Sequence, residues 1–110
     1  MPWHDHYFIL NDAHEPVEVT QHDWIHWCVE HEIIKDTRLN PNARVCTRWS
    51  GMIDDVTMPG PPTFKHIVNG PGLRDRRAET LTYDEALARH DRIVEWLRKR
   101  VERFGKTAAD

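Results

Sequence analysis

The stretch 43–70 constrains the fold more than any other, because two strand-like segments flank residues that cannot continue a strand. In both segments apolar and polar residues alternate, which is the periodicity of a half-buried strand. Between them, residues 59–62 read Pro-Gly-Pro-Pro, and proline has no backbone N–H to donate to a ladder. We therefore expect an antiparallel pair of strands joined by a long loop that the prolines stiffen.

The residues before this pair predict a hairpin and a helix. Residues 6–10 and 16–20 are short strand-like runs, and an Asn-Asp pair between them favours a turn. Thr20 with Asp23 approximates a capping box, and the sequence WIHWCVEHEII that follows has helical periodicity. Residues 36–42 contain Asn-Pro-Asn and are expected to form a loop.

The residues after the pair predict a connection and a long helix. Residues 73–79 are polar and favour a surface connection. Apolar residues repeat at helical spacing over residues 83–104, Thr82 with Glu85 forms a capping box, and Gly105 is expected to end the helix. The predicted order is β-β-α-β-β-α, an α+β fold with a mostly antiparallel sheet and two helices on one face.

Length and composition predict one folded domain. With 110 residues, the chain is expected to form a single domain over residues 1–110, with an ordered core of about residues 6–104 and a tail at 105–110. No apolar run approaches the roughly 20 residues of a membrane span, and the N-terminal residues lack a signal-peptide pattern. The two cysteines are not in a CxxC pair, so we expect a reduced, cytoplasmic protein without a membrane partner.

The charge is unevenly distributed along the chain. The net charge is −3, yet residues 1–36 carry eight acidic residues and one basic residue, whereas residues 92–110 carry six basic and three acidic residues. The overall acidity argues against nucleic acid as a partner.

Three motifs follow one another along the chain: a helix with a Trp-x-x-Trp centre, a strand that opens with Pro-Pro, and a last helix with Thr-x-x-Glu-Ala. Their order resembles a family of small uncharacterised proteins encoded by tailed phages and prophages. The resemblance covers about residues 6–98 and departs at Lys65, where the family has glutamate, and at Asp54-Asp55, where the family tends toward Asp-His. It implies a phage-type accessory protein of the host cytosol and supplies no activity. The matching residues are Val17, Trp24, Trp27, Thr47, Gly51, Pro61, Pro62, Phe64, Gly70, Glu85, Ala86 and His90.

The first predicted helix indicates an interface. Its apolar face is broader than the usual stripe of a surface helix, and a chain this small has little core to cover it. We expect a homo-oligomer, most simply a twofold dimer. The predicted interface residues are Trp24, Ile25, Trp27, Cys28 and Val29.

Tryptophan and arginine are the residues that most often anchor binding surfaces. Trp3, Trp24, Trp27 and Trp49 together are more tryptophan than a core of this size readily hides. If the helices cover the apolar side of the central strands, Arg44 and Arg48 stand on the open face beside the proline-rich loop. The predicted binding residues are Arg44, Arg48, Trp49, Arg74, Arg76 and Arg77.

The histidines leave a metal site open as an alternative. His22, His26 and Glu30 share one helical face, where two histidines at i and i+4 can chelate a divalent ion, and His4 or His6 could add a ligand. A solvated polar face is the simpler interpretation, so we expect no metal and no cofactor.

Three other groups also have a simpler structural interpretation. Asp54 and Asp55 could bind Mg²⁺ but are more typical of a turn, and His90 is more typical of a satisfied core histidine than of a base. Cys28 and His31 are one turn apart and could form a nucleophile and its base, but both fall on the apolar face.

No set of residues supplies a nucleophile, a base and an orienting group together, so we expect a binding protein rather than an enzyme. With the resemblance, this predicts a counter-defence inhibitor that binds a host immune protein or sequesters a small anionic ligand such as a nucleotide signal. A virion or packaging accessory factor, a metal-dependent enzyme and a small nucleic-acid binder remain open.

Overall fold

The computed structural model describes residues 5–74 and 76–109, with side chains as far as residue 104. This part of the chain is an α+β fold with two helices and seven strands in two antiparallel sheets. In chain order the elements are β1 (Asp5–Leu10), β2 (Pro16–Val19), α1 (Gln21–His31), β3 (Ile33–Asn40), β4 (Ala43–Ser50), β5 (Met52–Asp54), β6 (Thr63–Asn69), β7 (Arg76–Thr80) and α2 (Tyr83–Ala109).

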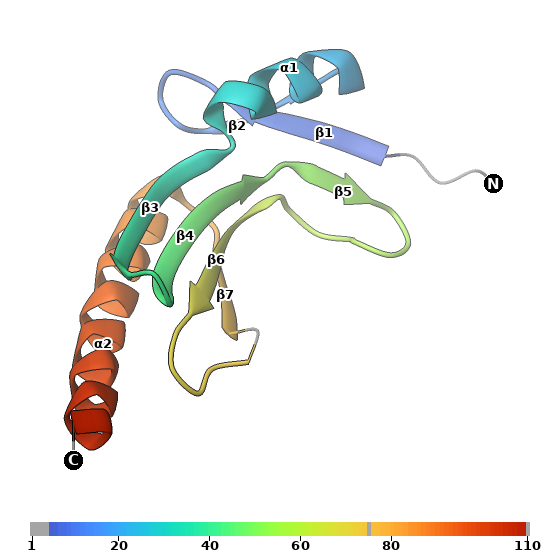
Figure 1. The fold of residues 1–110 in the computed structure, drawn as a ribbon. Coiled ribbons are helices and arrows are strands. Elements are labelled where there is room, and N and C mark those ends of the chain that lie inside the picture. The colour runs from blue at the N-terminus through green and yellow to red at the C-terminus, as the bar shows by residue number, and fades with distance from the viewer. Residues whose placement is uncertain (1–4, 75, 110) are drawn as a thin grey trace.

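The strands divide into a smaller and a larger sheet. The smaller sheet has the order β2-β1-β5, and the larger sheet has the order β3-β4-β6-β7. Figure 1 shows α1 beside the smaller sheet at one end of the molecule and α2 running along the larger sheet to the other end. The α+β class and the antiparallel pairing are confirmed. The two helices, however, pack on different sheets, and three of the strands were not predicted.

The predicted central pair is confirmed as β4 and β6. Their register runs from Arg44 opposite Asn69 to Ser50 opposite Thr63. α2 packs against all four strands of the larger sheet and buries one of its faces. The resulting core cluster consists of Ala43, Val45, Val68, Val94 and Leu97.

A second core cluster joins the two sheets. It consists of Leu10, Trp49, Phe64 and Ala86, with Phe8, Trp27, Ile34 and Tyr83 packed around it. The Trp49 indole Nε1 donates a hydrogen bond of 2.8 Å to the Phe8 carbonyl, and the Phe8 amide donates one of 2.7 Å to the Gly51 carbonyl. Gly51 alone separates β4 from β5, so the chain passes from one sheet to the other at this residue.

Two of the unpredicted strands lie at the edges of the larger sheet. Residues 33–40 form β3 where the sequence predicted a longer helix and then a loop, because α1 ends at His31. Residues 76–80 form β7 within the predicted polar connection. Edge strands tolerate charged side chains, since their outer side faces water, and this weakens the alternation that identifies a strand.

Both predicted helix starts are confirmed, and the predicted end of α2 is wrong. The Thr20 hydroxyl accepts a hydrogen bond from the Asp23 amide, and the Thr82 hydroxyl accepts one from the Glu85 amide. α2 continues through Gly105 to Ala109. A glycine inside a helix costs about 1 kcal/mol and ends it only when the backbone also leaves the helical region.

The molecule is elongated. Its Cα radius of gyration is 16.5 Å and its principal extents are 60 × 31 × 22 Å. A compact domain of this length has a radius of gyration of about 13 Å. Neither helix in the described part of the chain combines the length and the apolar character needed to cross a membrane.

Candidate functional site

The face of the larger sheet away from α2 is rich in cations. Residues opposite each other in the register share a face, and Arg48 lies opposite Lys65, which lies opposite Glu79. Applied along the sheet, the register places five cations and two carboxylates on this open face, a net charge of +3 in a chain whose total is −3. The charged residues of the open face are Asp36, Arg38, Arg44, Arg48, Lys65, Arg77 and Glu79.

The two arginines predicted on this face differ in their partners. Arg44 makes a bidentate pair with Asp36, with Nε and Nη2 at 2.7 and 2.6 Å from the two carboxylate oxygens. The hydrogen bonds from Arg44 hold the pKa of Asp36 below its ordinary value. Arg44 is therefore already engaged, whereas the Nε of Arg48 is buried and has no hydrogen-bond partner among the described residues.

A cleft of about 260 Å³ opens beside Arg48. Trp24 and Glu32 reach it from α1 and its C-terminal end, Arg48 and Lys65 come from β4 and β6, and apolar side chains complete the wall. The indole Nε1 of Trp24 is, like Arg48 Nε, a buried donor without a partner in the described chain. The apolar wall includes Trp49, Met52, Met58 and Ile67.

Among the described residues, no ion pair joins Arg48 or Lys65 to a carboxylate. Arg48 and Lys65 are direct cross-strand neighbours, and like charges in this position destabilise a sheet. Two carboxylates lie nearby: Glu32 lines the cleft, and Glu79 lies opposite Lys65 in the register. An oxyanion between Arg48 and Lys65 would relieve their repulsion.

A neighbouring hollow of about 400 Å³ shares four lining residues with the cleft and extends under the proline-rich loop.

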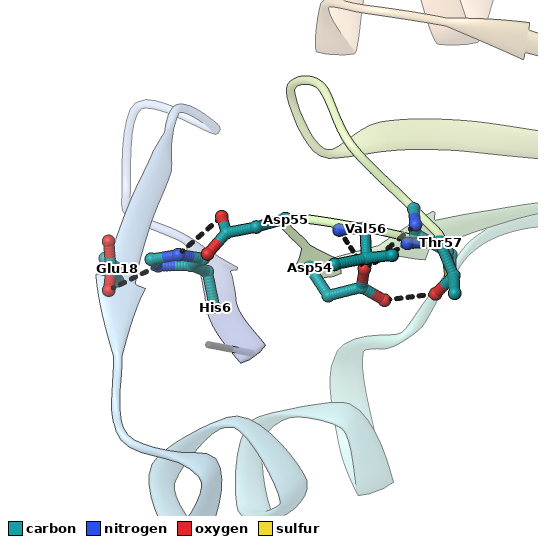
Figure 2. Close-up of polar contacts among 7 residues, drawn as sticks. His6, Glu18, Asp54, Asp55, Val56 and Thr57 are labelled. Atoms are coloured by element: carbon teal, nitrogen blue, oxygen red, sulfur yellow. Dashed lines mark hydrogen bonds and ion pairs between the residues drawn. The ribbon is translucent and has the colours of Figure 1, made fainter. Parts of the chain in front are cut away.

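Asp54 shapes this loop, as Figure 2 shows: its carboxylate accepts hydrogen bonds from the amides of Val56, Thr57 and Met58 and from the Thr57 hydroxyl. These hydrogen bonds lower the pKa of Asp54 to about 2, and the bond from the Thr57 hydroxyl has the largest effect. Asp54 ends β5 and Asp55 begins the bend that follows it, and the oxygens of Asp54 are used within this loop.

The other predicted binding residues do not form one surface. Trp49 is 1 % exposed and belongs to the core, and it also borders the cleft. Arg77 lies on the open face opposite Ile67, whereas Arg76 lies opposite Val68 on the side that α2 covers. Arg74 is exposed in the loop before β7.

The predicted interface face of α1 is only partly exposed. Trp24 packs on Tyr7 with ring centroids 5.1 Å apart, and Trp27 packs against the second core cluster. Cys28 is half-buried, and burial raises the pKa of its thiol. Ile25 and Val29 are the exposed pair, at 49 % and 80 %. Trp3 lies outside the described residues.

Within the part of the chain that the structure describes, the residues of the alternative metal site do not come together. The rings of His22 and His26 lie 4.4 Å apart, and Glu30 lies 3.9 Å from His31. Among residues 5–74 and 76–109, no group of three or more His, Cys, Asp or Glu side chains could hold a metal ion. His4 lies outside the described residues.

His6 is instead placed between two carboxylates. Its Nδ1 lies 3.3 Å from Glu18 on β2, and its Nε2 lies 3.4 Å from Asp55 after β5 (Figure 2). The hydrogen bond to Glu18, followed by charge interactions with Glu18 and Asp55, raises the pKa of His6. These exposed contacts connect β2, β1 and the loop after β5.

A buried polar chain crosses the core between the larger sheet and α2. His90 Nε2 lies 2.8 Å from the Thr37 hydroxyl, and His90 Nδ1 lies 2.7 Å from the Thr47 hydroxyl. The Thr47 hydroxyl also lies 2.7 Å from His66 Nδ1, and His66 Nε2 lies 2.9 Å from the Thr80 hydroxyl. The prediction of His90 as a satisfied core histidine is confirmed. Sequence reasoning missed His66, although its alternation with Phe64 and Val68 placed it on the buried face.

Comparison with family models, with curated proteins and with solved structures found no match for this chain.

Proposed function

We propose that this chain is a binding protein whose cleft at Arg48 and Trp24 takes a small anionic ligand. The observation that carries the proposal is the pair of buried donors, Arg48 Nε and Trp24 Nε1, that lack a hydrogen-bond partner in the described chain. A buried donor without a partner costs about 1–3 kcal/mol. A ligand oxygen that reached these donors would supply the missing partner and recover part of that cost.

The chemistry of the lining favours a phosphate or carboxylate attached to an apolar ring. A guanidinium binds either group in a planar, bidentate manner, and the ammonium of Lys65 adds a point charge from the neighbouring strand. The side chains of Met52, Met58 and Ile67 offer an apolar surface beside these cations. A nucleotide combines both requirements, which favours it over a host protein as the partner.

In a phage-type protein, such binding would sequester a nucleotide signal of the host in its cytosol, as counter-defence. Neither histidine nor cysteine is among the described lining residues of the cleft. The proposal therefore assigns binding to this site without a chemical step.

Calorimetric titration of the whole chain with mononucleotides and cyclic dinucleotides tests the proposal. At least one ligand should bind and raise the Tm, and Arg48→Gln should weaken its binding by about 10- to 100-fold, because a hydrogen bond to a charged group is lost. Arg98→Gln is the matched control, since Arg98 is exposed on α2 and paired with Glu95.

Glu32→Gln provides a test in the opposite direction. It removes a negative charge from the cleft wall and should tighten binding of the same ligand. The absence of binding across the panel, or equal affinity of the Arg48→Gln variant and the wild type, would rule the cleft out as an anion site.

A further inference from the structure

α2 carries a stripe of cations interrupted by an exposed tryptophan. Five residues follow one another at steps of three or four, so they share one face of the helix: Arg89, Arg92, Trp96, Lys99 and Arg103. Trp96 is 42 % exposed, a large fraction for this side chain. We refer to these five residues as the basic stripe.

Most acidic residues of α2 (Asp84, Asp91, Glu95 and Glu102) share a neighbouring face, whereas Glu85 precedes Arg89 by four residues and lies in line with the basic stripe. Asp91 binds Lys35 of β3, and Glu95 binds Arg98, so these carboxylates are directed away from the basic stripe. Glu85, at the start of the helix, is engaged with the Thr82 hydroxyl. Although the formal charge of the whole chain is −3, this surface is locally basic. The net charge therefore does not predict what the surface binds.

A hollow of about 290 Å³ lies beside Trp96. Its described lining consists of Arg89, Arg92, Ile93 and Trp96. It is shallow and open to solvent, so it offers a surface on which a ring can lie and not an enclosed pocket. An aromatic wall with two guanidinium groups suits a flat ring that carries a phosphate nearby.

The basic stripe borders the loop between β6 and β7. Arg100 lies with its guanidinium 5.7 Å from the Trp96 ring centroid and 4.9 Å from that of Phe104, and its Nε donates a 2.8 Å hydrogen bond to the Pro71 carbonyl. Arg74 is exposed three residues further along the same loop.

We propose that the basic stripe binds single-stranded nucleic acid, with the cations on phosphates and a base stacked on Trp96. From Arg89 to Arg103 the helix rises about 21 Å, long enough to follow several nucleotides of a backbone. Bases in a single strand are free to stack on an aromatic side chain, whereas those of a duplex are not. A membrane surface would require a broad apolar face, and the basic stripe has only Trp96 between its cations.

This site is separate from the cleft at Arg48, which lies on the opposite face of the larger sheet. The anion site in the cleft and the nucleic-acid site on the basic stripe can therefore be tested independently. Arg48→Gln should leave the affinity for an oligonucleotide unchanged.

Fluorescence anisotropy of a labelled oligothymidylate, titrated with the whole chain at low and at moderate salt, tests the proposal. Binding should weaken as salt rises, because counterions are released from the phosphates. Trp96→Ala should weaken binding about tenfold through the loss of stacking, and Trp96→Phe should retain most of it. Circular dichroism of each variant verifies that the exposed substitution leaves the fold intact.

Arg92→Glu and Arg98→Glu form a matched pair on the same helix. Each changes the charge by the same amount, but only Arg92 belongs to the basic stripe. Arg92→Glu should weaken binding at least about tenfold, and Arg98→Glu by less than about twofold.

Four outcomes would overturn the proposal. They are no binding at low salt, equal losses in Arg92→Glu and Arg98→Glu, binding to a duplex as tight as to the single strand, and competition by polyglutamate as effective as by unlabelled oligothymidylate. The last result would identify an acidic protein as the partner instead.

Discussion

At the scale of single residues, one hydroxyl holds two fully buried imidazoles. The Thr47 hydroxyl has one proton and contacts Nδ1 of both His66 and His90, so it can donate to at most one of the two rings. If it donates to one ring and accepts from the other while both rings are neutral, one ring carries its proton on Nδ1 and the other on Nε2. The hydrogen bonds from Thr37 to Thr80 then run in a single direction through the core.

This arrangement predicts that stability falls in mild acid. Burial, followed by the charges of His90 and Arg89, lowers the pKa of His66 to about 4, and burial and Lys35 lower the pKa of His90. Between this value and the ordinary histidine pKa of about 6.5, the unfolded chain binds more protons than the folded one. The free energy of unfolding should therefore decrease as pH falls from about 6.5 towards 4, by up to about 3 kcal/mol for His66.

Urea unfolding at a series of pH values measures this loss, and NMR titration of the imidazole signals assigns it. His66 should keep the signals of a neutral ring down to about pH 5. His6 is the internal control, because its raised pKa makes it titrate at higher pH. Asp54, with a pKa of about 2, stays ionised in the folded protein throughout this window, and because its carboxyl in the unfolded chain binds protons only below about pH 5, it contributes to the loss only at the acidic end. A stability that is flat between pH 6.5 and about 4 would contradict the assignment.

At the scale of elements, the passage from β4 to β5 depends on a close approach at Gly51. A Cβ on this residue would overlap the Phe8 carbonyl and lie 2.6 Å from Trp49 Nε1 and 3.0 Å from Trp24 Nε1. The Phe8 carbonyl is a backbone atom that already accepts a hydrogen bond from Trp49, so it cannot move aside freely. Gly51 therefore allows the two sheets to join and the two indoles to lie beside the cleft.

Gly51→Ala should destabilise the protein by about 1–3 kcal/mol, as expected for overpacking against backbone. Chemical denaturation measures the loss. Gly60→Ala is a useful comparison, because space is open around Gly60 and only its positive φ of 101° opposes the substitution. If Gly51→Ala proves as stable as the wild type, the sheets do not approach each other as closely as described.

At the scale of the whole molecule, cations are concentrated on two surfaces of an acidic chain. One is the open face of the larger sheet, and the other is the basic stripe of α2 on the opposite side. Neither surface is a contiguous run in the sequence. Each arises because register or helical periodicity aligns residues that are separated along the chain.

The oligomeric state remains a prediction at this scale. The sequence predicted a dimer through α1, and the structure leaves Ile25 and Val29 as the exposed apolar pair of that helix. Sedimentation at micromolar concentration should give twice the chain mass of 13.0 kDa.

Val29→Lys should return the protein to the monomer, because a charge at the centre of an apolar contact cannot be buried unpaired. Val56→Lys is the control, since Val56 is also an exposed valine but belongs to the loop after β5 and not to α1. A monomeric wild type would contradict the prediction.

The sequence by itself determined the local elements. Alternation predicted β1, β2, β4 and β6, hydroxyl caps predicted the starts of both helices, and apolar spacing predicted the buried face of α2 with His90 in it. These features follow from neighbours within a few residues, which is the range over which periodicity and capping act.

Only the tertiary structure decided how those elements are used. It paired Arg44 with Asp36 but left Arg48 Nε without a partner, although both arginines lie on the same face of β4. It brought Thr47 to His90, 43 residues away in the chain. It also buried Trp49 and exposed Trp96. These contacts and exposures depend on which strands become neighbours and on which residues lie opposite each other in the register. Neither can be predicted from the sequence of a single strand.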